Sequence, residues 1–296
     1  MIKKSPIYVK FLILSLLLLT SCVSGCVTID NKEPKSKEIL PRLAFVQIQH
    51  SVKVEGCGLD AKTGEEKCQK AVLQYVSSGA YVFHSEVSQG TSYVLTAGHS
   101  CESKFPKSQI IDGFRVQNKG STFKTQDING FQHEAEVIMI NRRFDLCLLQ
   151  VSNVIMNPPL LKLADKEPIR GETVTNMAAP HGLFWPGTVL IFKGQFSGYH
   201  DKGYSVYTIP TKPGSSGSPI INKNNELVGV IFAGYRTIEN VGLSSPLVAI
   251  KVFLKKSIAK GEMQLWEKGN EPRLNTQIDR VWIQKMRHKL NKVFGD

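Results

Sequence analysis

Short runs of β-branched and aromatic residues, separated by Gly, Asn, Asp and Pro, fill most of the chain between positions 44 and 232. Runs of this length, with turn residues at short intervals, are typical of all-β sandwiches and barrels. The segments predicted as strands are Ala44–Ile48, Ala71–Val76, Gly79–Phe83, Tyr93–Thr96, Glu134–Ile140, Leu146–Val151, Val189–Lys193, Ser205–Ile209, Ile220–Ile221 and Leu227–Phe232.

Apolar residues at helical spacing occur only near the C-terminus. The segments Pro246–Ala259 and Thr276–Phe294 place apolar residues three and four positions apart, which predicts two helices. Pro246 fits a first helical turn, and Gly261 fits a position just after a helix end. We therefore expect a mainly β protein with C-terminal helices.

Composition places the 296-residue chain among ordinary globular proteins. Hydrophobic residues make up 42% and charged residues 21%, which excludes a disordered chain, a collagen-like chain and a polytopic membrane protein. The formal net charge of +12 is compatible with anionic surfaces such as nucleic acid or lipid headgroups. Because no nucleic-acid-binding motif accompanies this charge, we expect no nucleic-acid partner.

The N-terminal residues have the pattern of an export signal. Lysines at positions 3, 4 and 10 precede the apolar run Phe11–Leu19, which is too short for a permanent transmembrane helix and fits a cleaved secretory leader. The next residues, Thr20-Ser21-Cys22, complete a segment that resembles the lipobox of bacterial lipoproteins, in which the cysteine is diacylated and becomes the new N-terminus. Cys26 ends a second match, but Cys22 directly follows the apolar run and is preferred. A plain signal peptide is the alternative.

These motifs predict residues 1–21 as a lipoprotein signal peptide and residues 22–41 as a tether. Residues 30–41 are charged and contain proline, a composition typical of linkers. Diacylation would meet the requirement of more than one chain for stable membrane anchoring. We therefore expect an exported protein that a lipid anchor holds to a membrane of the cell envelope. Removal of the three leader lysines lowers its formal net charge from +12 to +9.

Four cysteines remain for the folded domain, namely Cys57, Cys68, Cys101 and Cys147. In an oxidising compartment an even number favours disulfides. The first two flank a polar segment rich in turn residues between two strand-like runs, so a local hairpin disulfide is favoured, and this leaves Cys101 to pair with Cys147. A zinc site is the competing interpretation, but no Cys-x-x-Cys or His-x-x-x-His spacing supports it. We expect neither a metal nor a cofactor.

Three segments have the residue types for covalent catalysis. Ser92–His99 is a strand that ends in small residues and a histidine. Arg143–Val151 places one carboxylate, Asp145, at the start of an apolar strand, where it needs a hydrogen-bonding partner to offset desolvation. Pro213–Ile220 is a glycine-rich turn that can present a hydroxyl group and backbone N–H groups to an oxyanion.

The same segments resemble the His, Asp and Ser blocks of trypsin-like serine proteases. The matching blocks are Thr-Ala-Gly-His at 96–99, Asp-Leu-Cys-Leu-Leu at 145–149 and Pro-Gly-Ser-Ser-Gly-Ser-Pro at 213–219. The blocks occur in the order His, Asp, Ser, whereas subtilisins have the order Asp, His, Ser and α/β-hydrolases the order Ser, Asp, His. The resemblance covers roughly residues 44–255 and is closest to the bacterial HtrA-like branch, with no PDZ-like segment evident after Gly261. Further matching segments are Val174–Leu183, Gly194–Gly198, Ile220–Val230 and Val241–Pro246.

The resemblance implies a chymotrypsin-like fold of two six-stranded antiparallel β-barrels over residues 42–260, with barrel one at about 42–160 and barrel two at about 161–250. It implies that Ser216 is the nucleophile, His99 the general base and Asp145 the residue that orients the histidine. The backbone N–H groups of Gly214 and Ser216 would form the oxyanion hole.

The function that follows is a serine endopeptidase that hydrolyses peptide bonds of proteins through an acyl-enzyme and is lipid-anchored in the bacterial envelope. The alternative is a non-catalytic envelope binding protein on a protease scaffold, because fold does not guarantee function.

Departures from the family pattern concern activation, the disulfide and the pocket. Ser215 stands where zymogen-activated relatives have an Asp, so activation by a new N-terminus is not expected. By family position, a Cys101–Cys147 disulfide would tie the histidine segment to the aspartate strand. Pro210 occupies the position of the trypsin pocket Asp, which favours a small or medium apolar substrate residue over Lys or Arg. The predicted pocket residues are Pro210, Thr211, Phe232, Ala233 and Gly234.

The last 36 residues, 261–296, are predicted as a basic amphipathic helical tail. Its apolar face either packs on the second barrel or lies against a membrane or partner. The residues predicted on this face are Ile278, Trp282, Met286, Leu290 and Val293.

Overall fold

Strands β1 (Phe45–Leu59) and β2 (Glu66–His84) form a long antiparallel hairpin in this computed structural model. The structure describes residues 42–59, 63–102, 107–111, 114–154, 157–235, 237–269 and 276–294. The predicted signal peptide, the tether, Cys22 and Cys26 lie outside the described residues. All described residues belong to one unit of the chain, Glu38–Asp296.

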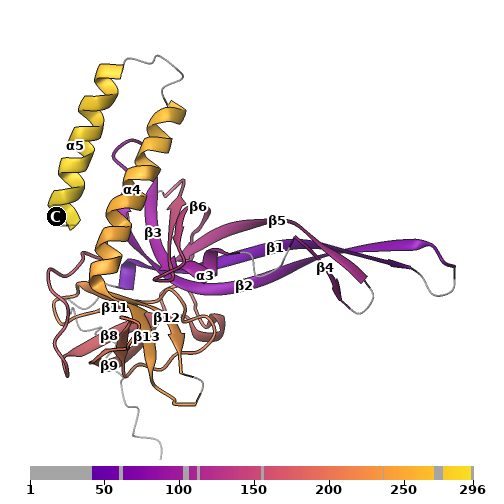
Figure 1. The fold of residues 1–296 in the computed structure, drawn as a ribbon, viewed down its shortest axis with the longest axis horizontal. Coiled ribbons are helices and arrows are strands. Elements are labelled where there is room, and N and C mark those ends of the chain that lie inside the picture. The colour runs from indigo at the N-terminus through magenta and orange to yellow at the C-terminus, as the bar shows by residue number, and fades with distance from the viewer. Residues whose placement is uncertain are drawn as a thin grey trace, which may run out of the picture. The chain divides into compact units, whose positions relative to one another are not determined.

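The first barrel is built around this hairpin (Figure 1). Its sheet has the order β1-β2-β3-β7-β6-β5-β4, and a further pairing of β1 with β5 closes six of the strands, leaving β4 on the outer edge of β5. The other strands of this sheet are β3 (Ser92–Ala97), β4 (Ser108–Ile111), β5 (Phe114–Asp127), β6 (Gln132–Asn141) and β7 (Leu146–Val151).

The second barrel is a closed six-stranded sheet with the order β10-β13-β12-β11-β8-β9. Its pairings are antiparallel. The prediction of a mainly β protein with two six-stranded antiparallel barrels is therefore confirmed. The strands are β8 (Thr173–Ala178), β9 (Leu190–Tyr199), β10 (Ser205–Tyr207), β11 (Pro219–Ile221), β12 (Leu227–Gly234) and β13 (Gly242–Ser245).

Strands β3 and β7 are covered on both faces and are mostly apolar. All residues of β3 and β7 are buried, and the two strands pair with each other at the centre of the sheet. One face of β7 points into the barrel core, and helix α4 (Leu247–Gly269) packs near the other. A strand buried on both faces has no need for polar residues at alternate positions, which explains the run Leu146–Val151.

Strands β4, β5, β8 and β13 were absent from the sequence prediction. The sequence of β5 is mostly polar and carries few apolar residues at alternate positions. It is a strand because its backbone pairs with β1 over most of its length. The prediction failed because β5 buries only Phe123 and Thr125, and most of its length is held by backbone pairing to a distant strand.

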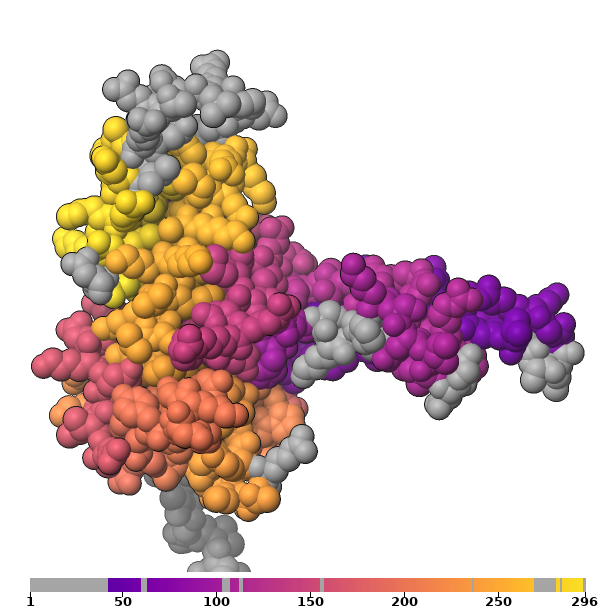
Figure 2. All heavy atoms as spheres, viewed as in Figure 1, coloured from indigo at the N-terminus to yellow at the C-terminus, as the bar shows by residue number. Residues whose placement is uncertain are grey.

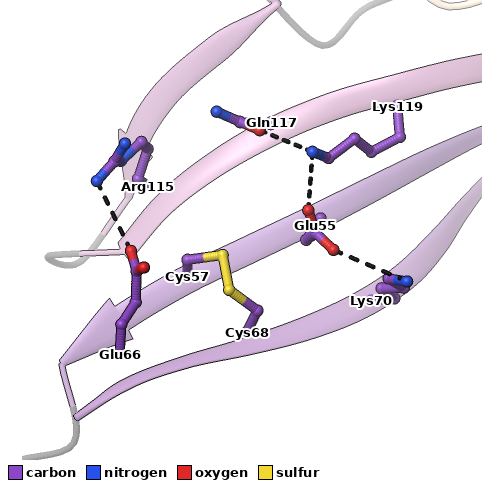
Figure 3. The surroundings of a disulfide bond; sticks show 8 residues. All are labelled: Glu55, Cys57, Glu66, Cys68, Lys70, Arg115, Gln117 and Lys119. Carbon is purple, nitrogen blue, oxygen red and sulfur yellow. Dashed lines mark hydrogen bonds and ion pairs between the residues drawn. A yellow bond between two sulfur atoms is a disulfide. The ribbon is translucent and has the colours of Figure 1, made fainter.

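Beyond the barrel, the distal part of the β1–β2 hairpin ends in the predicted disulfide Cys57–Cys68. Around this bond, Glu55 pairs with Lys119 at 2.8 Å and with Lys70 at 3.9 Å, as Figure 3 shows. The hydrogen bond from Lys119 lowers the pKa of Glu55. The disulfide and these pairs join β1, β2 and β5 where few side chains are buried.

Helix α4 continues ten residues beyond the predicted end at Ala259, so the helix-stop prediction at Gly261 is wrong. Gly261 is buried inside the helix, where an added Cβ would lie 2.6 Å from the ring of Tyr93. The next residue, Glu262, is also buried and accepts hydrogen bonds from the Tyr93 hydroxyl at 2.8 Å and the Glu86 N–H at 3.0 Å. Burial raises the pKa of Glu262. Gly261 therefore allows α4 to pack closely against Tyr93, and it does not end the helix.

Helix α5 (Thr276–Phe294) has the predicted bounds, but its apolar face packs on α4 and the first barrel rather than on the second barrel. Trp282 stacks on Trp266 of α4 with ring centroids 5.2 Å apart, and Phe294 lies 6.4 Å from Phe83 of β2. Phe294 is buried, whereas the predicted Val293 is 48% exposed. The helix that precedes α5 covers its apolar face, so α5 completes a helical hairpin on the first barrel.

In the described ranges, no helix combines the length and the apolar character needed to cross a membrane.

Candidate active site

His99 lies on the short helix α3 (Gly98–Cys101), directly after β3. The N–H of Gly98 donates to the carbonyl oxygen of Asp145 at 2.8 Å, so the helix starts against the turn that precedes β7. A Cβ at Gly98 would lie 2.8 Å from Oδ1 of Asp145. A glycine is therefore needed immediately before the histidine for the two segments to approach each other.

Asp145 holds the histidine through two contacts. Its Oδ1 accepts a hydrogen bond from the backbone N–H of His99 at 2.6 Å, and its Oδ2 lies 2.7 Å from the ring Nδ1 of His99. Asp145 itself has a φ of 51°, a left-handed conformation that Asp and Asn adopt more readily than other non-glycine residues. The Asp145 carboxylate thus has the hydrogen-bonding partner that offsets its desolvation at the start of an apolar strand.

Ser216 comes from the second barrel, in the turn before β11. Its Oγ lies 2.9 Å from Nε2 of His99. The side chains of His99 and Asp145 are 35% and 23% exposed, so the site is open to solvent on one side. The structure thus brings together the three predicted residues in a chain of contacts that runs from Asp145 through His99 to Ser216.

The peptide unit between Pro213 and Gly214 determines where the Gly214 N–H points. The carbonyl oxygen of Pro213 accepts a hydrogen bond from His181, in the 3-10 turn η1 (Pro180–Gly182). In a trans peptide the N–H points to the opposite side from the C=O, so the Gly214 N–H faces away from η1. Gly214 has a φ of +95°, and a Cβ there would lie 2.4 Å from the carbonyl oxygen of Ala179. Both the positive φ and the contact that a Cβ would make with Ala179 require a glycine at position 214.

The sequence analysis missed Ser78, a fully buried residue of β2 that connects the two barrels at the site. Its Oγ donates to the carbonyl oxygen of Gly214 at 2.9 Å and accepts from the N–H of Ala179 at 3.0 Å. Its N–H donates to the carbonyl oxygen of Ser216 at 2.8 Å. Ser78 is therefore a positioning residue for the turn that carries Gly214 and Ser216. The signal in the sequence was the polar pair Ser77-Ser78 between two apolar runs.

A pocket of about 310 Å³ lies beside Ser216. Four of the five predicted pocket residues line it, namely Thr211, Phe232, Ala233 and Gly234. Pro210 is not among the lining residues. A Cβ at Gly234 would lie 1.8 Å from Oγ1 of Thr211, so the Thr211 side chain fills the space next to that glycine. No carboxylate lines the pocket among the described residues.

The second disulfide joins the histidine and aspartate segments as predicted. Cys101 is the last residue of α3, and Cys147 lies in β7, two residues after Asp145. Both cysteines are buried. A covalent bond therefore holds α3 against β7 directly behind the contact between His99 and Asp145.

Removing this disulfide is expected to lower the free energy of unfolding by about 2–4 kcal/mol. The double variant Cys101→Ala/Cys147→Ala, measured by urea denaturation, tests this. The matched control is Cys57→Ala/Cys68→Ala, which opens a disulfide spanning 11 positions rather than 46. We expect a smaller loss in the control, because a shorter loop restrains the unfolded chain less. Equal losses of unfolding free energy in the two double variants would contradict this dependence on loop length.

Within the part of the chain that the structure describes, no group of three or more His, Cys, Asp or Glu side chains is arranged to hold a metal ion. The two barrels and the contacts among Asp145, His99 and Ser216 define a class, that of two-barrel proteins in which a histidine and an aspartate of the first barrel meet a serine of the second.

The chain belongs to the trypsin-like peptidase family, since the trypsin-like peptidase domain matches residues 77–230, over half of the chain. The sequence is 26% identical over 172 residues to the periplasmic serine endoprotease DegP of Salmonella typhimurium and 25% identical over 196 residues to the serine protease Do-like HtrA of Bacillus subtilis. These matches cover 55% and 61% of this chain but only 36% and 43% of the relatives. The predicted resemblance to HtrA-like proteases is confirmed.

The fold is also similar to the crystal structure of the serine endoprotease from Yersinia pestis. The TM-score is 0.51 at 18% sequence identity, and the match covers 74% of this chain and 64% of that one. At this identity the similarity concerns the fold alone.

Proposed function

We propose that the protein is a serine endopeptidase that hydrolyses peptide bonds of proteins through the triad His99, Asp145 and Ser216. The observation that carries this proposal is the position of the His99 ring, with Nε2 2.9 Å from the Ser216 hydroxyl and Nδ1 2.7 Å from the Asp145 carboxylate. Membership of the trypsin-like peptidase family supports it.

In the first step, Oγ of Ser216 attacks the carbonyl carbon of the scissile peptide bond while Nε2 of His99 takes the hydroxyl proton. Asp145 holds the ring in the tautomer with the proton on Nδ1 and stabilises the imidazolium that forms. The C–N bond then breaks, and the imidazolium gives its proton to the leaving amine. The product is an acyl-enzyme on Ser216.

In the second step, a water molecule attacks the acyl-enzyme and His99 accepts one of its protons. The proton returns to Oγ of Ser216 as the ester bond breaks, which releases the carboxylic acid and restores the free serine. In both steps the negative charge on the carbonyl oxygen is stabilised by the N–H groups of Gly214 and Ser216. One such donor typically lowers the barrier by about 2.7–4 kcal/mol.

The pocket beside Ser216 supports a preference for a small apolar residue on the acyl side of the scissile bond. Thr211 occupies space next to Gly234, and a Cβ at Gly242 would lie 3.0 Å from Cγ2 of Thr211. The threonine side chain therefore limits the depth of the pocket. Since no acid is found among the lining residues that the structure describes, a basic substrate side chain would be buried without a counter-charge.

The cell envelope is the proposed location. The relative from Salmonella typhimurium is named a periplasmic endoprotease, and two disulfides fit an oxidising compartment. We further propose that residues 1–21 are a cleaved signal peptide, that Cys22, or alternatively Cys26, is lipidated, and that residues 22–41 tether the protease domain to the membrane.

Covalent labelling with a fluorophosphonate probe tests the proposed function, because the probe reacts with an activated serine hydroxyl. We expect saturable labelling of the mature, oxidised protein, located by fragmentation mass spectrometry at Ser216 and lost after denaturation. Hydrolysis of an unfolded protein substrate should stop as labelling reaches completion. A folded, oxidised protein that takes up no probe would favour the alternative of a non-catalytic binding protein on this scaffold.

A further inference from the structure

The turn that carries Asp145 is held by both barrels. Asp145 lies between β6 and β7 and so belongs to the first barrel. Figure 2 shows the salmon and orange atoms of the second barrel lying directly against the magenta and pink atoms of the first. Contacts that the second barrel makes with this turn therefore bear on the geometry of the candidate site.

Three consecutive carbonyl groups of this turn accept hydrogen bonds from three different segments. The carbonyl oxygen of Arg143 accepts from the hydroxyl group of Tyr204, just before β10, at 3.2 Å. The carbonyl oxygen of Phe144 accepts from the hydroxyl group of Ser245, in β13, at 2.5 Å. The carbonyl oxygen of Asp145 accepts from the first residue of α3. Two of the three donors thus come from the second barrel.

Ser245 is the stronger of these two donors. It is fully buried, so water has little access to replace its hydroxyl group as a donor. Tyr204 is partly exposed and its contact is longer, so water competes for the Arg143 carbonyl group. The Tyr204 ring also lies against Phe232 of the pocket, with centroids 4.9 Å apart. The Ser245 bond is therefore the one that the turn can least replace.

The backbone of Asp145 is in a left-handed conformation, with a φ of 51°. A non-glycine residue keeps such a conformation where the surrounding structure imposes it, and these positions cluster at functional sites. The angle φ describes how the peptide unit between Phe144 and Asp145 is rotated relative to the rest of Asp145. Because Ser245 binds the carbonyl oxygen of that peptide unit, it fixes the plane from which the Asp145 side chain projects.

We propose that Ser245 is a positioning residue for the Asp145 carboxylate, a role that deepens and rests on the proposed triad. By holding the Phe144 carbonyl group, Ser245 keeps Oδ2 of Asp145 at 2.7 Å from Nδ1 of His99. The second barrel then contributes to the site in two ways, because it supplies Ser216 and also orients the acid that holds the histidine.

Proton NMR of the mature, oxidised protein tests this positioning without requiring activity. A proton on Nδ1 of His99 that is hydrogen-bonded to a carboxylate resonates far downfield, and its loss in Asp145→Asn assigns it. We expect this resonance in the parent protein. In Ser245→Ala it should move upfield or disappear, because the contact between Nδ1 and the carboxylate loosens. Circular dichroism checks that the variant is folded.

Ser244→Ala is the matched control, because Ser244 is the neighbouring residue of β13 and is equally buried. Its hydroxyl group accepts from the N–H of Val230 at 2.7 Å and donates to the carbonyl oxygen of Ser245 at 2.9 Å. Among the described residues, these bonds do not involve the turn that carries Asp145. The control therefore loses buried hydrogen bonds but should keep the downfield resonance.

Initial rates on a chromogenic peptide give a second readout. Ser245→Ala should lower kcat about tenfold, the scale of one lost hydrogen bond, and leave KM unchanged because Ser245 does not line the pocket. Tyr204→Phe keeps the ring contact with Phe232 and removes the hydroxyl group, so kcat should fall by a smaller factor of about three. Ser244→Ala should keep kcat within about twofold of the parent value.

Three results would overturn the proposal. The first is a parent protein without a downfield resonance that Asp145→Asn removes. The second is a Ser245→Ala variant that keeps both the resonance and the parent kcat. The third is an equal effect of Ser245→Ala and Ser244→Ala, which would assign the loss to the second barrel as a whole. A parent protein that cleaves no peptide, but whose resonance responds to Ser245→Ala alone, would contradict the proposed function and support the positioning role.

Discussion

Ser216→Ala is expected to lower kcat for peptide hydrolysis by about 10⁶-fold, on the scale measured for loss of the nucleophile in a comparable triad. The variant removes the only atom of Ser216 that contacts Nε2 of His99. The backbone N–H and carbonyl group, which bonds to the N–H of Ser78, are unchanged. The free energy of unfolding should therefore stay within about 0.5 kcal/mol of the parent value.

The matched control is Ser215→Ala, which removes a hydroxyl from the adjacent residue. Among the residues that the structure describes, Oγ of Ser215 has a single, long contact of 3.4 Å with the N–H of Lys212, so most of the activity and the fluorophosphonate labelling should remain. Initial rates on a chromogenic peptide measure both variants. Equal losses in the two variants would mean that the turn, and not the Ser216 hydroxyl, is what the substitution disturbs.

Asp145→Asn is expected to lower kcat by about 10⁴-fold with little change in KM. An amide can donate a hydrogen bond to Nδ1 of His99, which stabilises the tautomer with the proton on Nε2. That tautomer cannot accept the Ser216 proton. Asn also tolerates the left-handed backbone found at this position, so the turn before β7 should persist and the effect can be assigned to the histidine.

A matched acid-to-amide change at Asp165 serves as the control. Asp165 is exposed, and its backbone oxygen, rather than its carboxylate, accepts the hydrogen bond from Lys251. Asp165→Asn should leave kcat and KM unchanged. Retention of more than about a tenth of the parent kcat in Asp145→Asn would remove Asp145 from the proposed triad.

The candidate site was predictable because its residues lie in short contiguous motifs. The segment that ends in His99, the strand that begins at Asp145 and the turn around Ser216 each combine distinctive residue types within a few positions. The disulfide Cys57–Cys68 was likewise predictable, because its two cysteines flank a single hairpin turn. A structural feature can be predicted from the sequence when the residues that form it lie within one short segment of the chain.

Other features were not predictable, because they depend on partners far away in the chain. The polar strand β5 is ordered by backbone pairing with β1, and no alternation of apolar residues marks it. Gly261 resembles a helix stop, but it is buried against Tyr93 of β3 and the helix continues. Ser78 contacts Gly214 across a sequence separation of 136 residues. Residue-by-residue propensities do not contain such contacts.

The sequence by itself determined the mainly β character, the catalytic candidates and the two cysteine pairs. Each of these depends on spacing, residue chemistry or a contiguous motif. The tertiary structure decided how Ser78 links the barrels behind Gly214 and Ser216, that Thr211 occupies the space next to Gly234, and where α5 packs. These outcomes depend on how side chains from separate elements pack against one another. The close packing of the folded interior determines that arrangement, and it cannot be read from any one segment of the sequence.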